Sequence, residues 1–282
     1  MSRLSVTFID VGWGDSILLE SEDSTGDKHY ALIDSNDTSG ERSSYAFVKR
    51  HLERSLGAST LPSPLFDFIL LTHAHTDHLS GLQWMMRDFQ TDWFWYPRSD
   101  ASAGFTKLLR YAGRYTTKVS RHQAIDQTKV LPNFGDATMS VLWPPHSSGP
   151  HDRRNPNNNS VVLLLTLGMV SFVLTGDCEA TNWPAIVPSL PTSGLLLFQS
   201  PHHGANNGMF DGSLTPWLDA LSTDTRIAMS SHIIPHHHPD AAVVSELSSR
   251  GFTPFYRTDE HYHVTVSTEG TSTTDLEIKW AR

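Results

Sequence analysis

The segment Thr72-His73-Ala74-His75-Thr76-Asp77-His78 places three imidazoles and one carboxylate within six residues. It directly follows an apolar run at residues 66–71, which predicts a buried strand, and it precedes residues 79–86, which predict a helix. The four polar side chains therefore lie at the carboxyl edge of a sheet, where α/β-type folds place their chemistry. Burying them together without a cation would leave several polar groups unpaired. Imidazole and carboxylate are ligands of Zn²⁺ and, more loosely, of Mn²⁺ or Fe²⁺, so the segment predicts a metal site.

Six further motifs follow the pattern of one known family. The segment above resembles the metal-binding motif of the metallo-β-lactamase fold, and the whole set resembles the hydrolase domain of ComEC-type competence proteins and its free-standing relatives. An N-terminal hairpin, Asp10-Val11-Gly12-Trp13-Gly14-Asp15-Ser16, has Trp13 where that subfamily has Gln. The remaining motifs are, in order, Asn157-Asn158-Asn159-Ser160, Thr175-Gly176-Asp177, Pro201-His202-His203-Gly204, His238-Pro239 and Tyr256-Arg257-Thr258-Asp259. The resemblance covers nearly the whole chain, and it implies an αββα sandwich of the α/β (α+β) class, with two mixed sheets flanked by helices.

Composition sets the size and class of the protein. The 282 residues contain no linker-like stretch, and 38% hydrophobic residues with 8 Trp are enough to bury a substantial core, so we expect one domain over residues 1–282. The single cysteine, Cys178, excludes an intramolecular disulfide and is expected to be a small buried residue. No secretory signal is visible, and the apolar stretch at 161–174 is shorter than the roughly 20 residues that span a bilayer. We therefore expect a cytoplasmic protein that has no membrane segment. The sequence does not indicate its oligomeric state.

The net charge of the chain limits the kinds of molecule that it is expected to bind. A formal net charge of −9 argues against tight, general binding to nucleic acid, which depends on Lys and Arg neutralising phosphates. A local basic stretch at 110–122, with interleaved tyrosines, is open to two interpretations: phosphate contact or an ordinary solvated helix face.

The hydrophobic pattern predicts strands that mostly precede helices in each half of the chain. Strands are expected at 4–10, 16–20, 29–33, 66–71, 93–96, 138–143, 160–167, 170–174, 195–199, 226–230, 254–256, 261–267 and 275–280, and helices at 42–56, 79–86, 103–115, 181–187 and 241–249. Gly168 separates two nearly continuous apolar runs, which indicates adjacent antiparallel strands.

The resemblance also implies the ligands of two divalent ions, Zn²⁺ or Mn²⁺. His73 and His75 would hold the first ion, Asp77 and His78 the second, and Asp177 would bridge both; the alternative for Asp177 is a helix N-cap. Either His202 or His203 completes the second site, with His203 favoured. His238 is expected to contact a substrate phosphate or to support a ligand, whereas His236 and His237 are interpreted as loop residues.

Several further residues are expected beside the metals. The third motif offers asparagines in place of a common histidine, which predicts an oxygen-richer and weaker first site, with Asn159 as the candidate to line it. Asp10, Asp15 and Asp34 are expected to accept the second N–H of a ligand histidine or, alternatively, to stabilise turns.

These features predict hydrolysis by a hydroxide that bridges two metals, with Asp77, Asp177 and His238 as catalytic residues. The main hypothesis is a phosphodiesterase or nuclease acting on DNA, RNA or a nucleotide. Hydrolysis of a small ester, such as a phosphocholine ester, a cyclic nucleotide or a lactone, is the alternative that the acidic balance favours. A metal-free binding protein is the third. Stacking on bases is a possible role for Trp13, Trp84, Trp93 and Trp95, although most of these are expected in the core.

Overall fold

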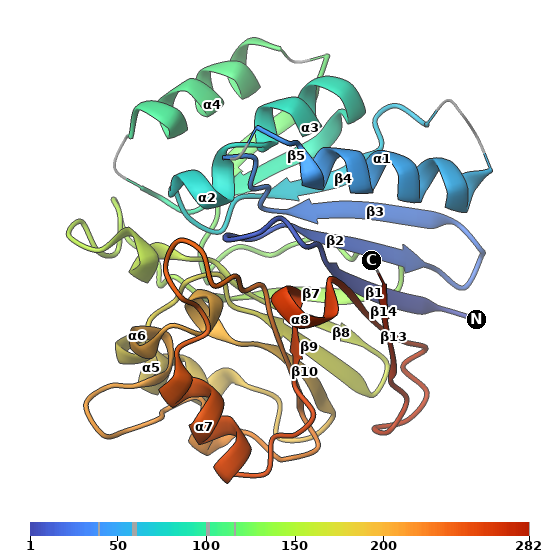
Figure 1. Ribbon diagram of the computed structural model, residues 1–282. Coiled ribbons are helices and arrows are strands. Elements are labelled where there is room, and N and C mark those ends of the chain that lie inside the picture. Colours follow the sequence, from blue (N-terminus) through green and yellow to red (C-terminus); the bar gives the residue numbers. More distant parts are fainter. Residues whose placement is uncertain (39, 58–60, 100–101, 116, 282) are drawn as a thin grey trace.

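The fold is known from a computed structural model, which describes residues 1–38, 40–57, 61–99, 102–115 and 117–281. Two β-sheets pack face to face, with helices on both outer surfaces (Figure 1). The strands of the first sheet are β1 (Arg3–Phe8), β2 (Ile17–Glu22), β3 (Lys28–Ile33), β4 (Phe66–Leu70), β5 (Thr91–Tyr96), β6 (Val119–Ala124), β13 (His263–Thr268) and β14 (Glu277–Ala281). Those of the second are β7 (Thr138–Trp143), β8 (Val162–Leu167), β9 (Val170–Leu174), β10 (Leu195–Gln199), β11 (Arg226–Met229) and β12 (Tyr256–Arg257).

Both sheets are mixed. The order of the first is β14-β13-β1-β2-β3-β4-β5-β6, antiparallel from β14 to β3 and parallel from β3 to β6. The order of the second is β12-β11-β10-β9-β8-β7, parallel from β12 to β9 and antiparallel from β9 to β7. The predicted antiparallel pairing across Gly168 is confirmed, since Leu167 faces Val170 there.

Three hydrophobic clusters explain the layers. Apolar side chains of β1, β4, β8 and β9 meet between the two sheets, and residues such as Phe8, Phe68, Leu163 and Phe172 are fully buried there. Helices α1 (Ser43–Leu56), α3 (Leu82–Phe89) and α4 (Ala103–Arg114) cover the outer face of the first sheet. Helices α5 (Trp183–Ile186), α6 (Asn206–Met209) and α7 (Ala241–Ser249) cover the second. The expected αββα sandwich with two mixed sheets is therefore confirmed.

Two predictions of local structure needed correction. The region after residue 115 was expected to be a helix that runs into a loop, yet it contains β6, which is an edge strand beside β5 with a run of exposed polar residues at 120–122. The helix expected at 79–86 is two short helices, α2 (Thr76–Leu79) and α3, which are separated at Gly81. A Cβ at Gly81 would lie 3.1 Å from the Ser35 carbonyl oxygen. The close approach of Gly81 to the chain segment at Ser35 therefore favours glycine.

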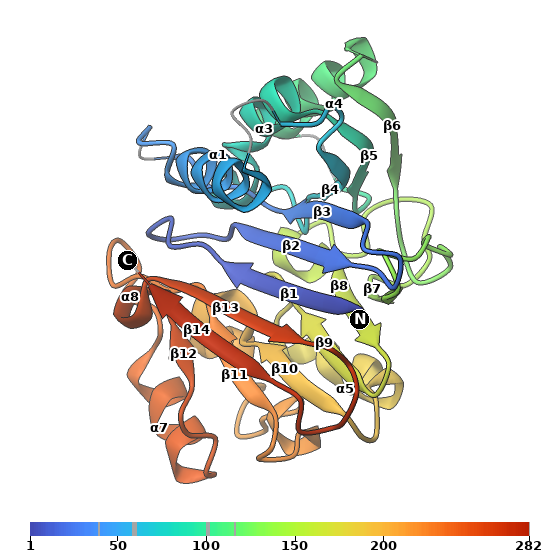
Figure 2. The same ribbon diagram turned by 90° about the vertical axis from the view of Figure 1, so that its right-hand side faces the viewer.

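The C-terminal strands divide between the sheets. β12 extends the second sheet, whereas β13 and β14 return to the first sheet and lie beside β1 (Figure 2). The last helix, α8 (Thr258–His261), connects the two sheets. None of the described helices is long and apolar enough to cross a bilayer.

Candidate metal centre

The carboxyl ends of five strands bring the candidate ligands together. The histidine-rich segment follows β4 and runs into α2, Asp34 follows β3, Asp177 follows β9, and His202 and His203 follow β10. His238 lies in the loop after β11. Because both sheets contribute, the site lies where their strand ends meet, as expected for an α/β-type sheet edge.

Four of these residues form one ligand group, which corresponds to the predicted second ion: Asp77, His78, Asp177 and His203 are all buried, and one ligand atom from each lies within 4.8 Å of the others. Nε2 of His78 lies 3.3 Å from Oδ2 of Asp177, and Nε2 of His203 lies 3.4 Å from Oδ1 of the same residue. Ligand atoms bound at about 2.1 Å to one tetrahedral ion are about 3.4 Å apart. The group therefore has the dimensions of a first coordination shell.

The other ligand group, which corresponds to the predicted first ion, consists of His73, His75 and Asp177, again within 4.8 Å of one another. Nε2 of His73 lies 3.5 Å from Oδ2 of Asp177. Asp177 thus belongs to both groups, which is the arrangement that a bridging carboxylate needs. Asp177 does not act as a helix cap: the residue before the next helical turn is Glu179.

The donor atoms themselves indicate that cations are required. Buried polar atoms without a hydrogen-bond partner include Nε2 of His73, His78 and His203 and Oδ1 of Asp177. All four atoms face the same small volume, as the distances above show. Leaving several buried polar atoms unpaired in one place is costly, and a divalent cation would satisfy them together. The residues present therefore fit a pair of divalent ions.

Neighbouring carboxylates orient the ligand histidines. Oδ2 of Asp34, which is fully buried, lies 2.7 Å from Nδ1 of His78 and also accepts the hydroxyl proton of Thr72. Asp15 accepts a hydrogen bond from Gln199 at 2.9 Å and lies 3.8 Å from Nδ1 of His203. His203 donates its Nδ1 proton to the Ser230 carbonyl at 2.9 Å. With Nδ1 engaged, Nε2 of His78 and of His203 is directed to the metal position.

The electrostatics of the site follow from burial and from these carboxylates. Burial alone lowers the pKa of His203, but Asp177 and Asp77 outweigh it and raise the pKa to about 9. Burial raises the pKa of Asp34 to about 6 despite its contact with His78. Burial lowers the pKa of His73 well below its usual range, and the nearby His78 adds to this effect. The site attracts positive charge through Asp177 while keeping one histidine neutral.

The ligand groups open onto a cleft of about 500 Å³, here called the metal cleft. Its walls are Trp13, His75, Asp77, Asn157, Asp177, His202, His203, Ala205, Asn206, Asn207, His232, His236, His238 and Asp240. His202 lies with its Nε2 3.6 Å from Asp177 but is outside both ligand groups, whereas His203 is inside one. Burial, with His203 and His202 nearby, lowers the pKa of His238 to about 4, so this half-buried imidazole is neutral at pH 7.

One predicted residue is placed differently from expectation, and another follows its alternative interpretation. Asn159 does not line the metal cleft: its amide donates to the Asp152 carbonyl and accepts from the Asp152 amide, so it closes a loop. Asn157 lies on the wall instead, with Nδ2 3.2 Å from Glu179. Asp10 accepts from the Gly12 amide and stabilises the hairpin, as its alternative interpretation held. The basic stretch 110–122 is not part of the described wall, and Arg121 lies over the Trp93 ring.

Several residues of the wall were not among the predicted site residues, and two of these are histidines, His232 and His236. A run of histidines in a loop carries no periodic signal, so only the course of the chain after β11 brings them to the metal cleft. Trp13 stands where the subfamily has Gln. This difference was the one sign in the sequence that Trp13 could lie on the wall of the metal cleft.

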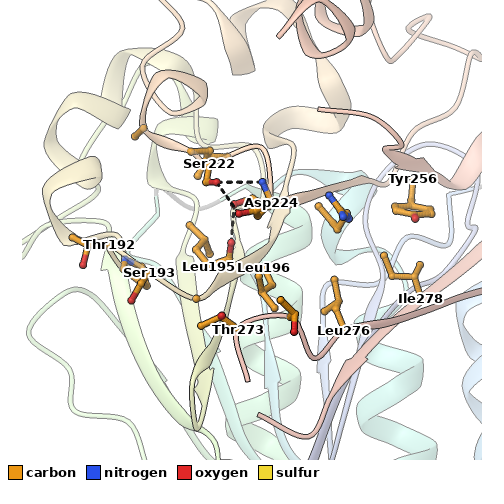
Figure 3. Close-up of a pocket in the computed structure, with 17 residues that line it drawn as sticks. Thr192, Ser193, Leu195, Leu196, Ser222, Asp224, Tyr256, Thr273, Leu276 and Ile278 are labelled. Atoms are coloured by element: carbon orange, nitrogen blue, oxygen red, sulfur yellow. Dashed lines mark hydrogen bonds between the residues drawn. The ribbon is translucent and has the colours of Figure 1, made fainter. Parts of the chain in front are cut away.

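A larger cavity of about 830 Å³ lies at the opposite end of the second sheet, between the starts of β10 and β11 and the segment that leads into β14 (Figure 3). Leu196, Tyr256, Leu276 and Ile278 contribute its apolar surface, and Figure 3 shows Ser222 and Asp224 on another part of its wall. Among the described residues that line it, Asp224 is the one carboxylate and there is no histidine. Size alone therefore does not identify the site, and the ligand chemistry lies in the smaller cleft.

Comparison with known proteins agrees with this geometry. ComE operon protein 3 of Bacillus subtilis is 26% identical over 270 residues, which is 92% of this chain and 32% of that protein. The chain thus spans about a third of the length of this relative. A metallo-β-lactamase fold protein of B. subtilis, YhfI, superposes with a TM-score of 0.53 at 15% identity, covering 91% of this chain and 95% of that one. A metallo hydrolase from the archaeon Ignicoccus hospitalis gives 0.50 at 12% identity, over 95% and 99%.

The family model described as a β-lactamase superfamily domain matches residues 49–238, which include His73, His75, Asp77, Asp177 and His203. With a metal-ligand set at the carboxyl ends of the strands and a metallo-β-lactamase fold, the chain belongs to the β-lactamase superfamily.

Proposed function

We propose that this protein is a binuclear metal-dependent hydrolase that cleaves phosphodiesters, as a phosphodiesterase or nuclease. The observation that carries the proposal is the position of Asp177, whose two carboxylate oxygens lie 3.3–3.5 Å from imidazole nitrogens of both ligand groups. A carboxylate shared in this way is the means by which a site holds two ions side by side. The coarser statement, a metallo-β-lactamase fold hydrolase with a His/Asp site, rests on the family match.

The ligand assignment follows the two groups. Asp77, His78, Asp177 and His203 hold one ion, and His73, His75 and Asp177 hold the other. When bound, two Zn²⁺ or Mn²⁺ ions supply a water nucleophile that ionises near neutral pH and polarise the phosphoryl oxygen. The group of His73, His75 and Asp177 offers fewer protein ligands, so its ion is the more easily lost. Asn157, whose buried Oδ1 lacks a described partner, replaces Asn159 as our candidate for an additional oxygen there.

The walls of the metal cleft suit an anion with several oxygens. His238 is neutral at pH 7 and therefore has one N–H to donate without adding a fixed charge. Asn206 and Asn207 add amide groups to the same wall. These groups would donate hydrogen bonds to a phosphate group in the metal cleft.

The choice of a phosphodiester over a small ester rests on the resemblance to ComEC-type hydrolase domains. The relative ComE operon protein 3 supports that branch of the family, although this chain matches a third of it. The alternative substrates are a phosphocholine ester, a cyclic nucleotide or a lactone, and the net charge of −9 favours such a small molecule over a long polyanion. We also propose that residues 1–282 act as one domain in the cytoplasm.

A side-by-side assay tests the proposal. The protein is loaded with Mn²⁺ or Zn²⁺ and given bis-nitrophenyl phosphate, single- and double-stranded DNA, a lactone and a carboxylester. We expect phosphodiester cleavage, and we expect Asp177→Ala to abolish it while the circular dichroism spectrum stays native. Cleavage of the lactone or carboxylester alone moves the function to the small-ester class. Absence of bound metal after loading, measured by elemental analysis, favours the metal-free binding protein.

A further inference from the structure

Trp13 stands on the wall of the metal cleft, although it belongs to a hairpin far from the metal ligands in sequence. The other tryptophans that the sequence offered for base stacking are placed elsewhere. Trp95 is buried in the core, Trp93 packs beside it, and Trp84 lies between the guanidinium groups of Arg42 and Arg87. Trp13 is half-buried, so part of its indole ring faces the cleft.

The backbone holds Trp13 in a fixed position. It lies between Gly12 and Gly14, both of which have positive φ angles of 75° and 95°. Gly14 packs against the backbone of Asp77, so closely that a Cβ at this position would collide with the Asp77 carbonyl oxygen. Asn36 donates a hydrogen bond from Nδ2 to the Trp13 carbonyl. The backbone at Trp13 is thus held against the loop that carries Asp77, which limits the reorganisation that binding would require.

The ring of His236 lies beside the indole of Trp13 on the wall of the metal cleft. Its ring meets Trp13 edge-on, with centroids 5.2 Å apart and an interplanar angle of 73°. It also lies 6.0 Å from the ring of His238, which places a continuous row of rings from the ligand side of the cleft to its rim. Among the described residues, His236 is the one aromatic ring in contact with Trp13, and a single ring can cover at most one face of the indole.

From this arrangement we infer that Trp13 and His236 form a stacking site for an unpaired nucleobase next to the scissile phosphate. The inference rests on the proposed function and narrows its substrate class. A base stacks on an indole through its π face, so the contact tolerates different sequences. A base inside a duplex has both faces covered by its neighbours and cannot reach the indole without being unstacked. The substrate is therefore a single strand or a nucleotide, which also needs fewer cationic contacts from this acidic chain.

The test separates the base from the phosphate. Binding is measured by calorimetry with thymidine 5′-monophosphate and with ribose 5-phosphate, which lacks the base. Hydrolysis is measured with Mn²⁺ on a single-stranded oligothymidylate, on an abasic strand of the same length and on a duplex. We expect the nucleotide to bind the wild type about ten-fold more tightly than the sugar phosphate, and the base-containing single strand to show a correspondingly lower KM.

The variants assign this preference to named residues. Trp13→Ala should remove the difference between nucleotide and sugar phosphate, whereas Trp13→Phe should retain most of it. His236→Ala should weaken the preference a few-fold. Two controls are matched to these: His237→Asn, which changes the adjacent histidine at a position outside the described wall, and Trp280→Ala, which removes an exposed tryptophan on β14. Both should leave the preference unchanged.

The results that overturn the inference differ from those that overturn the proposed function. Equal binding of nucleotide and sugar phosphate by the wild type would overturn the stacking site, and so would a Trp13→Ala variant that loses affinity equally for both. Preference for the duplex over the single strand would do the same. Hydrolysis of bis-nitrophenyl phosphate in the same samples reports on the proposed function alone, because that assay does not depend on a nucleobase.

Discussion

The carboxylate of Asp34 holds Nδ1 of His78 at 2.7 Å, inside a pocket where both side chains are fully buried. The same carboxylate accepts the backbone N–H and the hydroxyl of Thr72, which fixes it relative to the end of β4. As a result, Nε2 of His78 has one available direction, toward Asp177 at 3.3 Å. Asp34, which follows β3, thus determines how the candidate ligand His78, which follows β4, meets Asp177 at the end of β9.

We therefore predict that Asp34→Asn weakens metal binding without removing a ligand. An amide has one acceptor oxygen and no charge, so it cannot accept from both Thr72 groups and from Nδ1 of His78 as the carboxylate does, and loss of such a partner costs roughly 10–100-fold in metal affinity. Competition with a metal-binding dye measures the change. Asp10→Asn is a suitable control, because Asp10 accepts from the Gly12 amide in the hairpin and is outside the described wall. Equal affinities in wild type and Asp34→Asn would show that His78 is oriented by other contacts.

We predict two divalent ions per protomer, with the ion of the His73–His75 group lost first. His75→Ala should reduce the stoichiometry to about one and abolish hydrolysis, while Asp177→Ala should lower the affinity for both ions because Asp177 belongs to both groups. Elemental analysis after dialysis against graded chelator gives the counts. Chelation should also lower the melting temperature, since ions that bind the folded state alone stabilise it. A single ion in the wild type would contradict the shared role of Asp177.

Gly14→Ala should destabilise the protein and disturb the metal loop together. The new Cβ would lie 2.9 Å from Cβ of Asp77 at a residue whose φ is 95°, so both sterics and backbone conformation oppose it. We expect a loss of about 2 kcal/mol or more in the free energy of unfolding. Gly12→Ala is the matched control: its φ is 75°, but nothing lies within 4 Å of its Cβ, so about 1 kcal/mol is expected. Denaturant titration measures both, and equal losses would exclude the collision as the cause.

A pH dependence of stability should arise from His29 on β3. Burial alone lowers the pKa of His29, but the hydrogen bond from Nδ1 to Asp67 at 2.7 Å outweighs it and, with Asp23 at 3.6 Å, raises the pKa above 6.5. The stabilisation is therefore fully present below about pH 6.5 and lost as the pH rises through the folded-state value. Since the side chains are 28% and 42% exposed, it amounts to less than about 1 kcal/mol. The slope of unfolding free energy between pH 6.5 and 8 should decrease in His29→Gln and in Asp67→Asn.

Many of the helices and strands could be predicted from the sequence, because apolar runs indicate the elements and glycines indicate the turns between them. Strand β10 and helix α7 have the predicted bounds, and the pairing of β8 with β9 follows from Gly168. The position of β13 and β14 in the first sheet was not readable, since pairing with β1 depends on contacts across the whole chain. Cys178 is buried, as expected, and burial raises its pKa.

The candidate site was readable where the ligands lie close together in sequence or carry a family motif. The choice between adjacent residues was less certain: the ligand groups include His203, as favoured, but Asn157 takes the place on the wall expected for Asn159. Such choices depend on the direction of a side chain at a tight turn, which composition does not encode. His202 and His203, for example, both have positive φ angles. The ligand roles, like the single domain, remain predictions.

The ladder between β1 and β13 has a consequence for how the protein is made. Thr7 and Thr265 hydrogen bond across it although they are 258 positions apart in the chain. During synthesis, β1 leaves the ribosome long before β13 has been made. The edge of β1 that pairs with β13 therefore stays unpaired while the residues of both sheets are added. A circular permutant that begins at β13, continues through β14 and is joined by a linker to β1 would bring the two paired strands close together in sequence. Such a molecule should fold faster and aggregate less while carrying the same side chains.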